Sequence, residues 1–450
     1  MLKNMVLRSL LKWVLAMRYN TLIMSNEFLS YKAFGAVGDG KTDDLDAIIR
    51  THEAANKTGV GVCAEPNAVY YIGVPNKTAI IQTPTDWNTA KFIIDDSKIT
   101  AENRLDHVFS VESKQKPLEI TDIKAIRKGQ DKLDIQLPFD AFVLALDNTT
   151  KRYIREGLNQ DSGTEQTDSF ILFKDGQIDT NTRPDWNFEN ITSLYAYPID
   201  PDVLTINGGV FTTIANQAES KYNYYARGIS IRRSNVVVDG MYHDITGEGD
   251  HGAPYHGFIY ITECANITVS NCRLSGRKTY TTIGSAGLDV RMGSYDISIN
   301  KAVNLLFKDC EQINSIHDTN IWGIFTSNFT KNTTLENVKF SRYDAHRGVT
   351  NVKINNSVLG HMGIKLIGQG VCTVENSKVY SNCFIELRGD YGSTWEGEII
   401  IRNCEFIPDN PLKDGIVIVS SNNPGRHDFG YVCHAPKVTV EGMVIGNVQG

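Results

Sequence analysis

Long hydrophobic runs are missing from this chain of 450 residues. In the first 23 residues the longest uncharged apolar stretch is Trp13–Met17, which is too short for the core of a secretory signal or for a membrane span. A second methionine, Met24, stands just before a polar segment. We therefore interpret residues 1–24 as an unusual leader or a misassigned start, and we expect no membrane-spanning segment elsewhere.

Basic charge is also in short supply. Lys and Arg number 45 against 52 Asp and Glu, which gives a formal net charge of −7. A protein that binds DNA or RNA needs a basic surface to neutralise phosphates, so we expect no nucleic-acid partner. A local basic groove for an acidic sugar chain remains compatible with this balance.

Paired cysteine motifs are absent as well. The eight cysteines include no Cys-x-x-Cys pair and no zinc-type spacing, so a thiolate metal site is not expected. A calcium site would need clustered carboxylates, and the sequence shows no convincing set. We accordingly predict no metal and no cofactor. The composition gives no indication of an oligomeric state.

What the second half of the chain does contain is internal repetition. Nine short β-rich segments recur, each placing a polar residue before a small residue and an apolar one. Aligning them puts seven Asn or Asp residues in one column, at Asp239, Asn271, Asp309, Asn337, Asn356, Asn376 and Asn403. Their successive gaps are 32, 38, 28, 19, 20 and 27 residues. A further asparagine often stands five positions earlier, at Asn266, Asn304, Asn332 and Asn351.

The repeat predicts an all-β solenoid, because a single strand-turn-strand unit cannot bury its apolar side alone. Asn and Asp tolerate the left-handed backbone of a sharp corner, and stacked amides can hydrogen-bond from coil to coil. Three cysteines directly follow a corner residue, so we expect Cys272, Cys310 and Cys404 to be buried and unpaired. A leucine-rich repeat or a propeller would show a Leu framework or longer, more regular blades.

Residues 34–48 read Phe-Gly-Ala-Val-Gly-Asp-Gly-Lys-Thr-Asp-Asp-Leu-Asp-Ala-Ile. This stretch resembles the opening motif of the pectate-lyase-like superfamily, which includes polygalacturonases and phage tailspike depolymerases. The resemblance implies a right-handed parallel β-helix, with a helix over about residues 44–56 capping its N-terminal end. It also implies carbohydrate polymers as substrates and an extracellular or periplasmic location, but it does not fix the reaction.

The chain divides into four parts on these grounds. After residues 1–24, residues 25–99 are expected to form the N-terminal cap and the first coils. Residues 100–199 do not repeat and are predicted to form a small β-rich insertion. Residues 200–450 are predicted to form the β-helix that carries the candidate active site.

Candidate site residues come from stacking, since equal offsets from the corner place residues on one face at about 4.8 Å per coil. We predict four catalytic residues, His317, Tyr343, His346 and Arg347. We predict seven substrate-binding residues, Arg291, Asp318, Trp322, Asp344, Lys365, Arg388 and Tyr391. His317 and His346 stand eight and nine positions after their corner residues, and a one-residue difference turns a strand side chain to the other face.

β-Elimination of an acidic, uronate-containing polysaccharide is the reaction that these residues favour. A lyase must neutralise the sugar carboxylate, remove the C5 proton and protonate the leaving oxygen. Arg347 or Arg291 would neutralise, His346 or His317 would be the base, and Tyr343 would be the acid. The predicted partner is therefore an acidic polysaccharide or oligosaccharide.

Two alternatives stay open. Inverting hydrolysis needs two carboxylates about 6.5–9.5 Å apart. Asp318 and Asp344 are a candidate pair, although the repeat region lacks the Asp-Asp of polygalacturonases and only partly matches their Gly-His-Gly, at residues 250–252. The other alternative is a non-catalytic module that binds carbohydrate or forms a structural fibre. A purely structural solenoid would show Ser, Thr and Asn at the offsets that His, Arg and Tyr hold.

Overall fold

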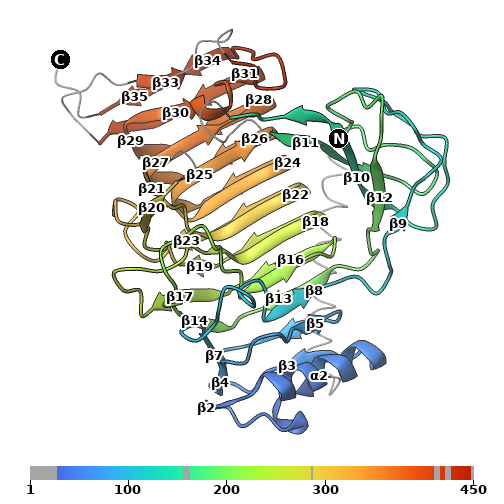
Figure 1. Ribbon diagram of the computed structural model, residues 1–450, viewed down its shortest axis with the longest axis vertical. Coiled ribbons are helices and arrows are strands. Elements are labelled where there is room, and N and C mark those ends of the chain that lie inside the picture. The colour runs from blue at the N-terminus through green and yellow to red at the C-terminus, as the bar shows by residue number, and fades with distance from the viewer. Residues whose placement is uncertain (1–27, 156–162, 285–286, 410–415, 421–426, 447–450) are drawn as a thin grey trace.

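The computed structural model describes residues 28–155, 163–284, 287–409, 416–420 and 427–446. The interpretation of residues 1–24 lies outside this part of the chain. Twenty-nine strands form a long sheet that winds into stacked coils, and every pairing within it is parallel (Figure 1). The predicted right-handed parallel β-helix is confirmed. Among the described helices, none has the length and hydropathy needed to cross a membrane.

The strands stack in three ladders, which define three faces of the β-helix. The first ladder contains β1 (Phe28–Ser30), β3 (Gly61–Cys63), β6 (Thr85–Asp86), β13 (Leu204–Asn207), β16 (Val236–Asp239), β18 (His256–Ser270), β22 (Tyr295–Lys308), β24 (Phe325–Glu336), β26 (Val349–Asn355), β28 (Gly368–Glu375), β31 (Trp395–Arg402) and β34 (Lys437–Glu441).

The second ladder contains β2 (Asp39–Asp43), β4 (Val69–Ile72), β7 (Lys91–Asp95), β14 (Val210–Ile214), β17 (Tyr242–Thr246), β19 (Arg273–Leu274), β23 (Glu311–Gln312), β25 (Lys339–Arg347), β27 (Val358–Leu366), β29 (Lys378–Ser381), β32 (Glu405–Pro408) and β35 (Val444–Ile445). The third contains β5 (Ala79–Ile81), β8 (Phe109–Val111), β15 (Ile229–Ile231), the first halves of β18, β22 and β24, the second halves of β25 and β27, β30 (Cys383–Leu387) and β33 (Ile416–Ser420).

The predicted corner column forms as expected, with one correction. Six of its seven residues, all but Asp239, adopt a left-handed backbone with φ between 50° and 54°. Asp239 pairs with Ser270, one position before the corner, and Gly240 occupies the corner at φ 69°. The prediction was wrong at this coil because glycine, which lacks a Cβ, takes that conformation without needing an Asn or Asp.

The asparagines five positions earlier form the unbroken ladder. Each Nδ2 donates to the Oδ1 of the asparagine one coil before it, at 2.9 to 3.0 Å. All members have φ between 57° and 62°, so the same residue type serves both the turn and the bonding. The ladder contains Asn235, Asn266, Asn304, Asn332 and Asn351.

A helix closes the N-terminal end of the β-helix. α2 (Leu45–Thr58) follows η1 (Lys32–Phe34) and lies at the end of the stack (Figure 1). It buries Ile48 and Ala55 against the first coils, and Asn56 donates to the carbonyl of Ile80. Its N-cap is Asp44, whose carboxylate accepts the backbone N–H groups of Val37 and Gly38 and thereby holds the glycine-rich turn.

The interior of the solenoid is one continuous hydrophobic core. Cys272, Cys310 and Cys404 are at most 2% exposed and form no disulfide, as predicted. Their thiols instead approach backbone carbonyls of the stacked turns. Small inward-facing groups are what the crowded corner accepts.

The insertion is a separate antiparallel sheet beside the coils (Figure 1). Its strands are β9 (Leu118–Glu119), β10 (Ala141–Arg152), β11 (Thr164–Leu172) and β12 (Ser193–Pro198). It contacts the β-helix through apolar side chains and through Lys331, whose buried ammonium lies 2.7 Å from Asp168 and 2.9 Å from Asp185. β8, by contrast, pairs with β5 and β15 and belongs to the solenoid. A second, smaller hairpin is formed by β20 (Thr281–Ile283) and β21 (Asp289–Arg291).

Candidate functional site

The third ladder carries the candidate site, and its side chains alternate between core and surface. Tyr343, Ile364 and Ile385 are in register and point into the core. The next position along each strand points outward and holds Asp344, Lys365 and Glu386. Because successive strand residues face opposite sides, Tyr343 and Asp344 are assigned to different surfaces.

This alternation corrects the prediction for Tyr343. Its ring is fully buried and packs on Phe325, and burial raises the pKa of its hydroxyl far above the usual value. A side chain inside the core has no access to a polysaccharide, so Tyr343 does not share a solvent-facing groove with the predicted histidines.

A groove runs across the outward side of β25, β27 and β30. Eight of its lining residues carry a charge, an imidazole or an indole, and four of the predicted site residues are among them. The lining includes Arg291, Thr319, Ile321, Trp322, Arg342, His361, Met362, Lys365, Ser381, Asn382, Cys383, Glu386, Arg388, Gly389 and Asp390.

Arg342 forms the floor of this groove. Its side chain is only 1% exposed and lies under Trp322, with its guanidinium carbon 5.2 Å from the ring centroid. One nitrogen, Nη2, is 2.7 Å from Asp344. The other two, Nε and Nη1, have no hydrogen-bond partner among the described residues. A buried donor without a partner costs about 1–3 kcal/mol, more when it is charged. Both nitrogens are buried from solvent, so an external acceptor reaches them only when the side chains that cover them move.

Ion pairs connect the floor to one end of the groove. Arg388 donates to Asp344 at 3.1 Å and to Asp390 at 2.8 Å, and Arg155 reaches Asp390 at 2.7 Å. Burial opposes ionisation of Asp344, but Arg342 and Arg388 outweigh it and lower its pKa to about 2. Asp344 is therefore a permanent anion that orients two guanidinium groups.

His361 stands on the other wall with one nitrogen engaged. Its Nε2 lies 3.1 Å from the carbonyl oxygen of Ile321, so Nε2 carries the proton and Nδ1 keeps its lone pair. Burial lowers the pKa of His361 below its ordinary value. A neutral imidazole with an unprotonated nitrogen is suited to accept a proton at neutral pH.

Other predicted residues lie at the rim of the groove or hold local turns. Arg291 donates to the carbonyl of Thr319, and Trp322 donates to the hydroxyl of Tyr295 at 3.1 Å. Asp318 accepts from the backbone and side chain of Asn320, which is a turn contact. His317 is exposed and packs edge-on against Tyr380, so it is outside the groove lining.

His346 and Arg347 turn away from the groove. Both side chains donate to the Oδ1 of Asn328, at 2.8 Å and 3.1 Å, and Arg347 also reaches Thr164 of the insertion. The His346 ring packs on Tyr391, which is itself buried in η2 (Gly389–Tyr391), and burial lowers the pKa of His346 to about 3. These contacts join the insertion to the coils behind the Arg388–Asp390 pair.

Comparisons with known proteins bear on the fold. No family model matches the sequence, and no curated protein matches it. The tailspike gp61 of Pseudomonas phage phi297 is similar in structure, with a TM-score of 0.56 and 12% identity over 94% of this chain and 76% of the tailspike chain. The chain therefore shares the right-handed parallel β-helix fold with this tailspike.

Two further solved structures match with lower TM-scores. The surface adhesin PfbA of Streptococcus pneumoniae gives 0.49 at 15% identity, over 93% of this chain and 91% of the adhesin. An exopolygalacturonase from Thermotoga maritima gives 0.38 at 11% identity, over 94% of this chain and 92% of the enzyme. At such identities the likeness concerns the β-helix and not its chemistry.

The β-helix also encloses polar networks that a substrate cannot reach. Thr213, His243 and Asp296 form a hydroxyl–imidazole–carboxylate chain with contacts of 2.9 and 2.8 Å. All three are at most 3% exposed, and His243 is stacked on Phe258. A substrate cannot reach these three side chains, so their hydrogen bonds serve to connect neighbouring coils.

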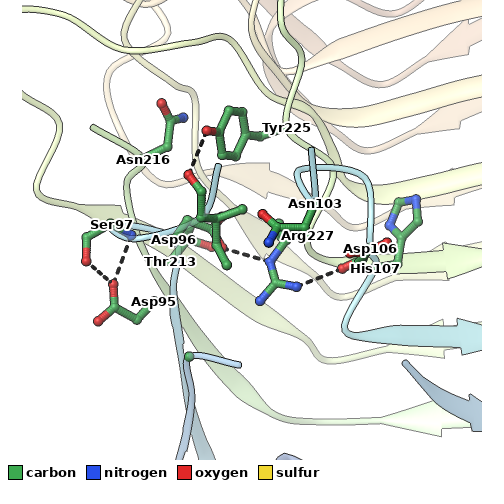
Figure 2. Close-up of polar contacts among 12 residues, drawn as sticks. Asp95, Asp96, Ser97, Asn103, Asp106, His107, Thr213, Asn216, Tyr225 and Arg227 are labelled. Carbon is green, nitrogen blue, oxygen red and sulfur yellow. Dashed lines mark hydrogen bonds and ion pairs between the residues drawn. The ribbon is translucent and has the colours of Figure 1, made fainter. Parts of the chain in front are cut away.

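A neighbouring ion pair is buried in the same way. Figure 2 shows the Arg227 guanidinium pointing at Asp96 and at the backbone of Asp106, with contacts of 3.1 Å and 3.0 Å. Burial raises the pKa of Asp96 to about 6, although Arg227 lowers it. Both side chains are at most 1% exposed, so this pair holds the early coils together.

Sequence reasoning missed four groove residues. Arg342 stands directly before the more conspicuous Tyr343 and was passed over, and His361 was not selected either. Glu386 and Asp390 carry no local motif and become part of the site only through pairing with Lys365 and Arg388. Among the described residues, no three His, Cys, Asp or Glu side chains gather closely enough to hold a metal ion.

Proposed function

We propose that the groove binds an acidic polysaccharide through its sugar carboxylate and cleaves it by β-elimination. The observation that carries the proposal is Arg342, a groove-lining residue whose buried guanidinium has two N–H groups without a partner among the described residues. A charged guanidinium N–H donates a strong, charge-assisted hydrogen bond to a carboxylate oxygen. Trp322 above it offers a flat apolar surface to the sugar ring.

The chemistry follows from the groups around that carboxylate. Arg342 neutralises the carboxylate and thereby stabilises the negative charge that develops when the C5 proton leaves. Nδ1 of His361 takes this proton, the electron pair forms the C4–C5 double bond, and the C4–O bond breaks. The departing oxygen receives a proton from the Lys365 ammonium, which solvent then replaces. Arg342 and His361 take the roles that Arg347, His317 and His346 had in the sequence analysis, and Lys365 takes that of Tyr343.

Inverting hydrolysis has weaker support. Its general acid needs a carboxyl group that stays protonated near neutral pH. Asp318 holds a turn, Asp344 has a pKa of about 2, and the pKa of Asp390 is lowered by Arg388 and Arg155 despite its burial. Asp344 and Asp390 are therefore not held in the protonated form.

The reaction is tested by incubating the protein separately with polygalacturonate, alginate and hyaluronate. β-Elimination creates a conjugated unsaturated uronate, which absorbs in the near ultraviolet. New reducing ends without this absorbance would show hydrolysis. Retention of the protein by a polymer with neither product would show a binding module.

The substitution His361→Gln is expected to lower kcat by about 10²–10⁴-fold, the range for a lost general base. The pKa of His361 is lowered from 6.5, so the imidazole stays neutral and able to accept a proton at pH values somewhat below 6.5. The wild-type rate should therefore fall only below pH 6.5, as His361 becomes protonated. The variant should lack this decrease. Rates are measured from pH 4 to 9, with His317→Gln as the matched control that keeps wild-type turnover. An unchanged rate for His361→Gln would remove this residue from the mechanism.

A further inference from the structure

A chain of aromatic rings lies on the third ladder, outside the groove. His107 stacks on Tyr260 with ring centroids 5.6 Å apart and planes 9° apart. Tyr260 contacts His256 at 5.4 Å, His256 contacts Tyr224 at 5.3 Å, and Tyr224 contacts Tyr222 at 6.3 Å. We name these five residues the aromatic track. Tyr222 is 49% exposed, and the other four residues are half-buried.

The track is continuous with the groove. Tyr260 belongs to the outward-facing column that passes through Ser298 and Thr326 to the strand position of Asp344 and then Lys365. Burial and the adjacent Tyr295 hydroxyl raise the pKa of Tyr224, and Tyr295 is the residue to which Trp322 of the groove donates. Along this face of the solenoid, the aromatic rings lie on the coils nearer the N-terminus and the charged groove lies on the coils nearer the C-terminus.

Small residues leave the rings standing above the sheet. Tyr260 is flanked in its column by Ser230 on one coil and Ser298 on the next. Both serines are at most 1% exposed, so the space between the rings is filled and a ligand would contact the solvent-exposed parts of the rings. A contiguous set of partly exposed rings on the outside of the β-helix is typical of an interaction site.

The track carries little charge of its own. Burial lowers the pKa of His107 to about 3 and lowers that of His256. At neutral pH both imidazoles are therefore uncharged, and the track is a row of neutral rings. Such rings contact the C–H face of a pyranose, because the negative face of an aromatic ring attracts the weakly positive hydrogens.

We propose that the aromatic track binds the pyranose faces of the polysaccharide segment that extends beyond the cationic groove. The groove holds one sugar by its carboxylate, and the track holds the sugars that follow it toward the N-terminal coils. The occupant is a glycan chain, as the continuity with the groove indicates. This inference rests on the proposed function for the identity of the chain, and it implies a preference for long substrates.

The test measures binding apart from cleavage. Wild type and Tyr260→Ala are run in native gels that contain polygalacturonate, alginate, hyaluronate or neutral xylan, and their mobility gives dissociation constants. We expect about tenfold weaker binding of at least one polymer by Tyr260→Ala, the effect of roughly 1.4 kcal/mol from a lost ring contact. Tyr260→Phe keeps the ring and should bind like wild type. Tyr195→Ala, a half-buried tyrosine of the insertion, is the matched control.

The outcomes separate the two proposals. If no polymer is cleaved but Tyr260→Ala loses retention, the track stands and the lyase proposal falls. If a polymer is cleaved and Tyr260→Ala retains wild-type binding and wild-type KM for long chains, the track falls and the lyase proposal stands. Failure of every polymer to retain the wild type would overturn the track. A change in oligomeric state of Tyr260→Ala by light scattering, with glycan binding intact, would assign the rings to a protein interface instead.

Discussion

Replacing Arg342 by methionine is expected to reduce kcat/KM on an acidic polysaccharide by about 10²–10³-fold, the range for loss of a donor that stabilises charge developing in the transition state. A charge-assisted hydrogen bond to the sugar carboxylate supplies this stabilisation. Methionine retains much of the side-chain volume beneath Trp322, so the indole keeps its support. The measurement is the initial rate of unsaturated product over a range of polymer concentrations.

Two comparisons make the Arg342 result specific. Arg342→Lys keeps the charge but loses the planar fork, so its activity should lie between those of wild type and Arg342→Met. Arg291→Met, at the groove rim, should have a smaller effect because the Arg291 side chain is exposed. Urea unfolding of each variant reports whether the coils remain intact. Wild-type kcat/KM for a folded Arg342→Met protein would contradict the carboxylate-binding role.

The largest effect on stability is expected from Asp296→Ala, which should lower the free energy of unfolding by about 3–5 kcal/mol. Asp296 is fully buried and accepts from Nδ1 of His243, from Nε of Arg277 and from the backbone N–H of Ser275. Without it, the Arg277 guanidinium stays in the core with no carboxylate partner. Urea unfolding near pH 7.5 measures the change, and Asp318→Ala, in a surface turn, should cost less than about 1 kcal/mol.

The same network makes stability depend on pH in two steps. Burial lowers the pKa of His243 below 6.5, so the unfolded chain takes up a proton first, and stability falls as pH drops through 6.5. The pKa of Asp296 is lowered from 3.8, because His243 and Arg277 outweigh its burial, so its contribution is present above pH 3.8 and lost as pH falls below that. Unfolding midpoints that stay constant from pH 7.5 to 3 would contradict this account.

The corner residues could be predicted from the sequence because a left-handed turn leaves a strong local preference. Asn337, Asn356 and Asn376, for example, all have a left-handed backbone, and Asn is one of the few residue types that accept it readily. The direction of side chains on the third ladder could not be predicted, because the loops between ladders differ in length. The inward residues Tyr343, Ile364 and Ile385 follow their corner residues by six, eight and nine positions. Equal offset therefore does not mean equal face, and Tyr343 was assigned to the wrong one.

The groove residues were partly predictable for a related reason. Trp322, Lys365 and Arg388 stand out as large or charged residues in a repeat that otherwise favours small polar ones, and all three line the groove. The partners that make them functional lie on other coils. The number of Arg342 N–H groups without a partner depends on how many carboxylates lie close to the guanidinium. Packing between coils sets that number, and the sequence around Arg342 does not reveal it.

The asparagine ladder has a direction, and this explains where aspartate is tolerated. Every bond runs from a donor amide to an acceptor one coil nearer the N-terminus, so an interior member must both give and receive. Aspartate can only receive. Asp309, in the corner column, and Asp239, one position before the corner, each accept from the corner asparagine of the next coil, and each starts a two-member run. The amide hydrogen bonds of the ladder and of the corner column therefore all run toward the N-terminal end, and an aspartate can stand only at the first, accepting position of such a series.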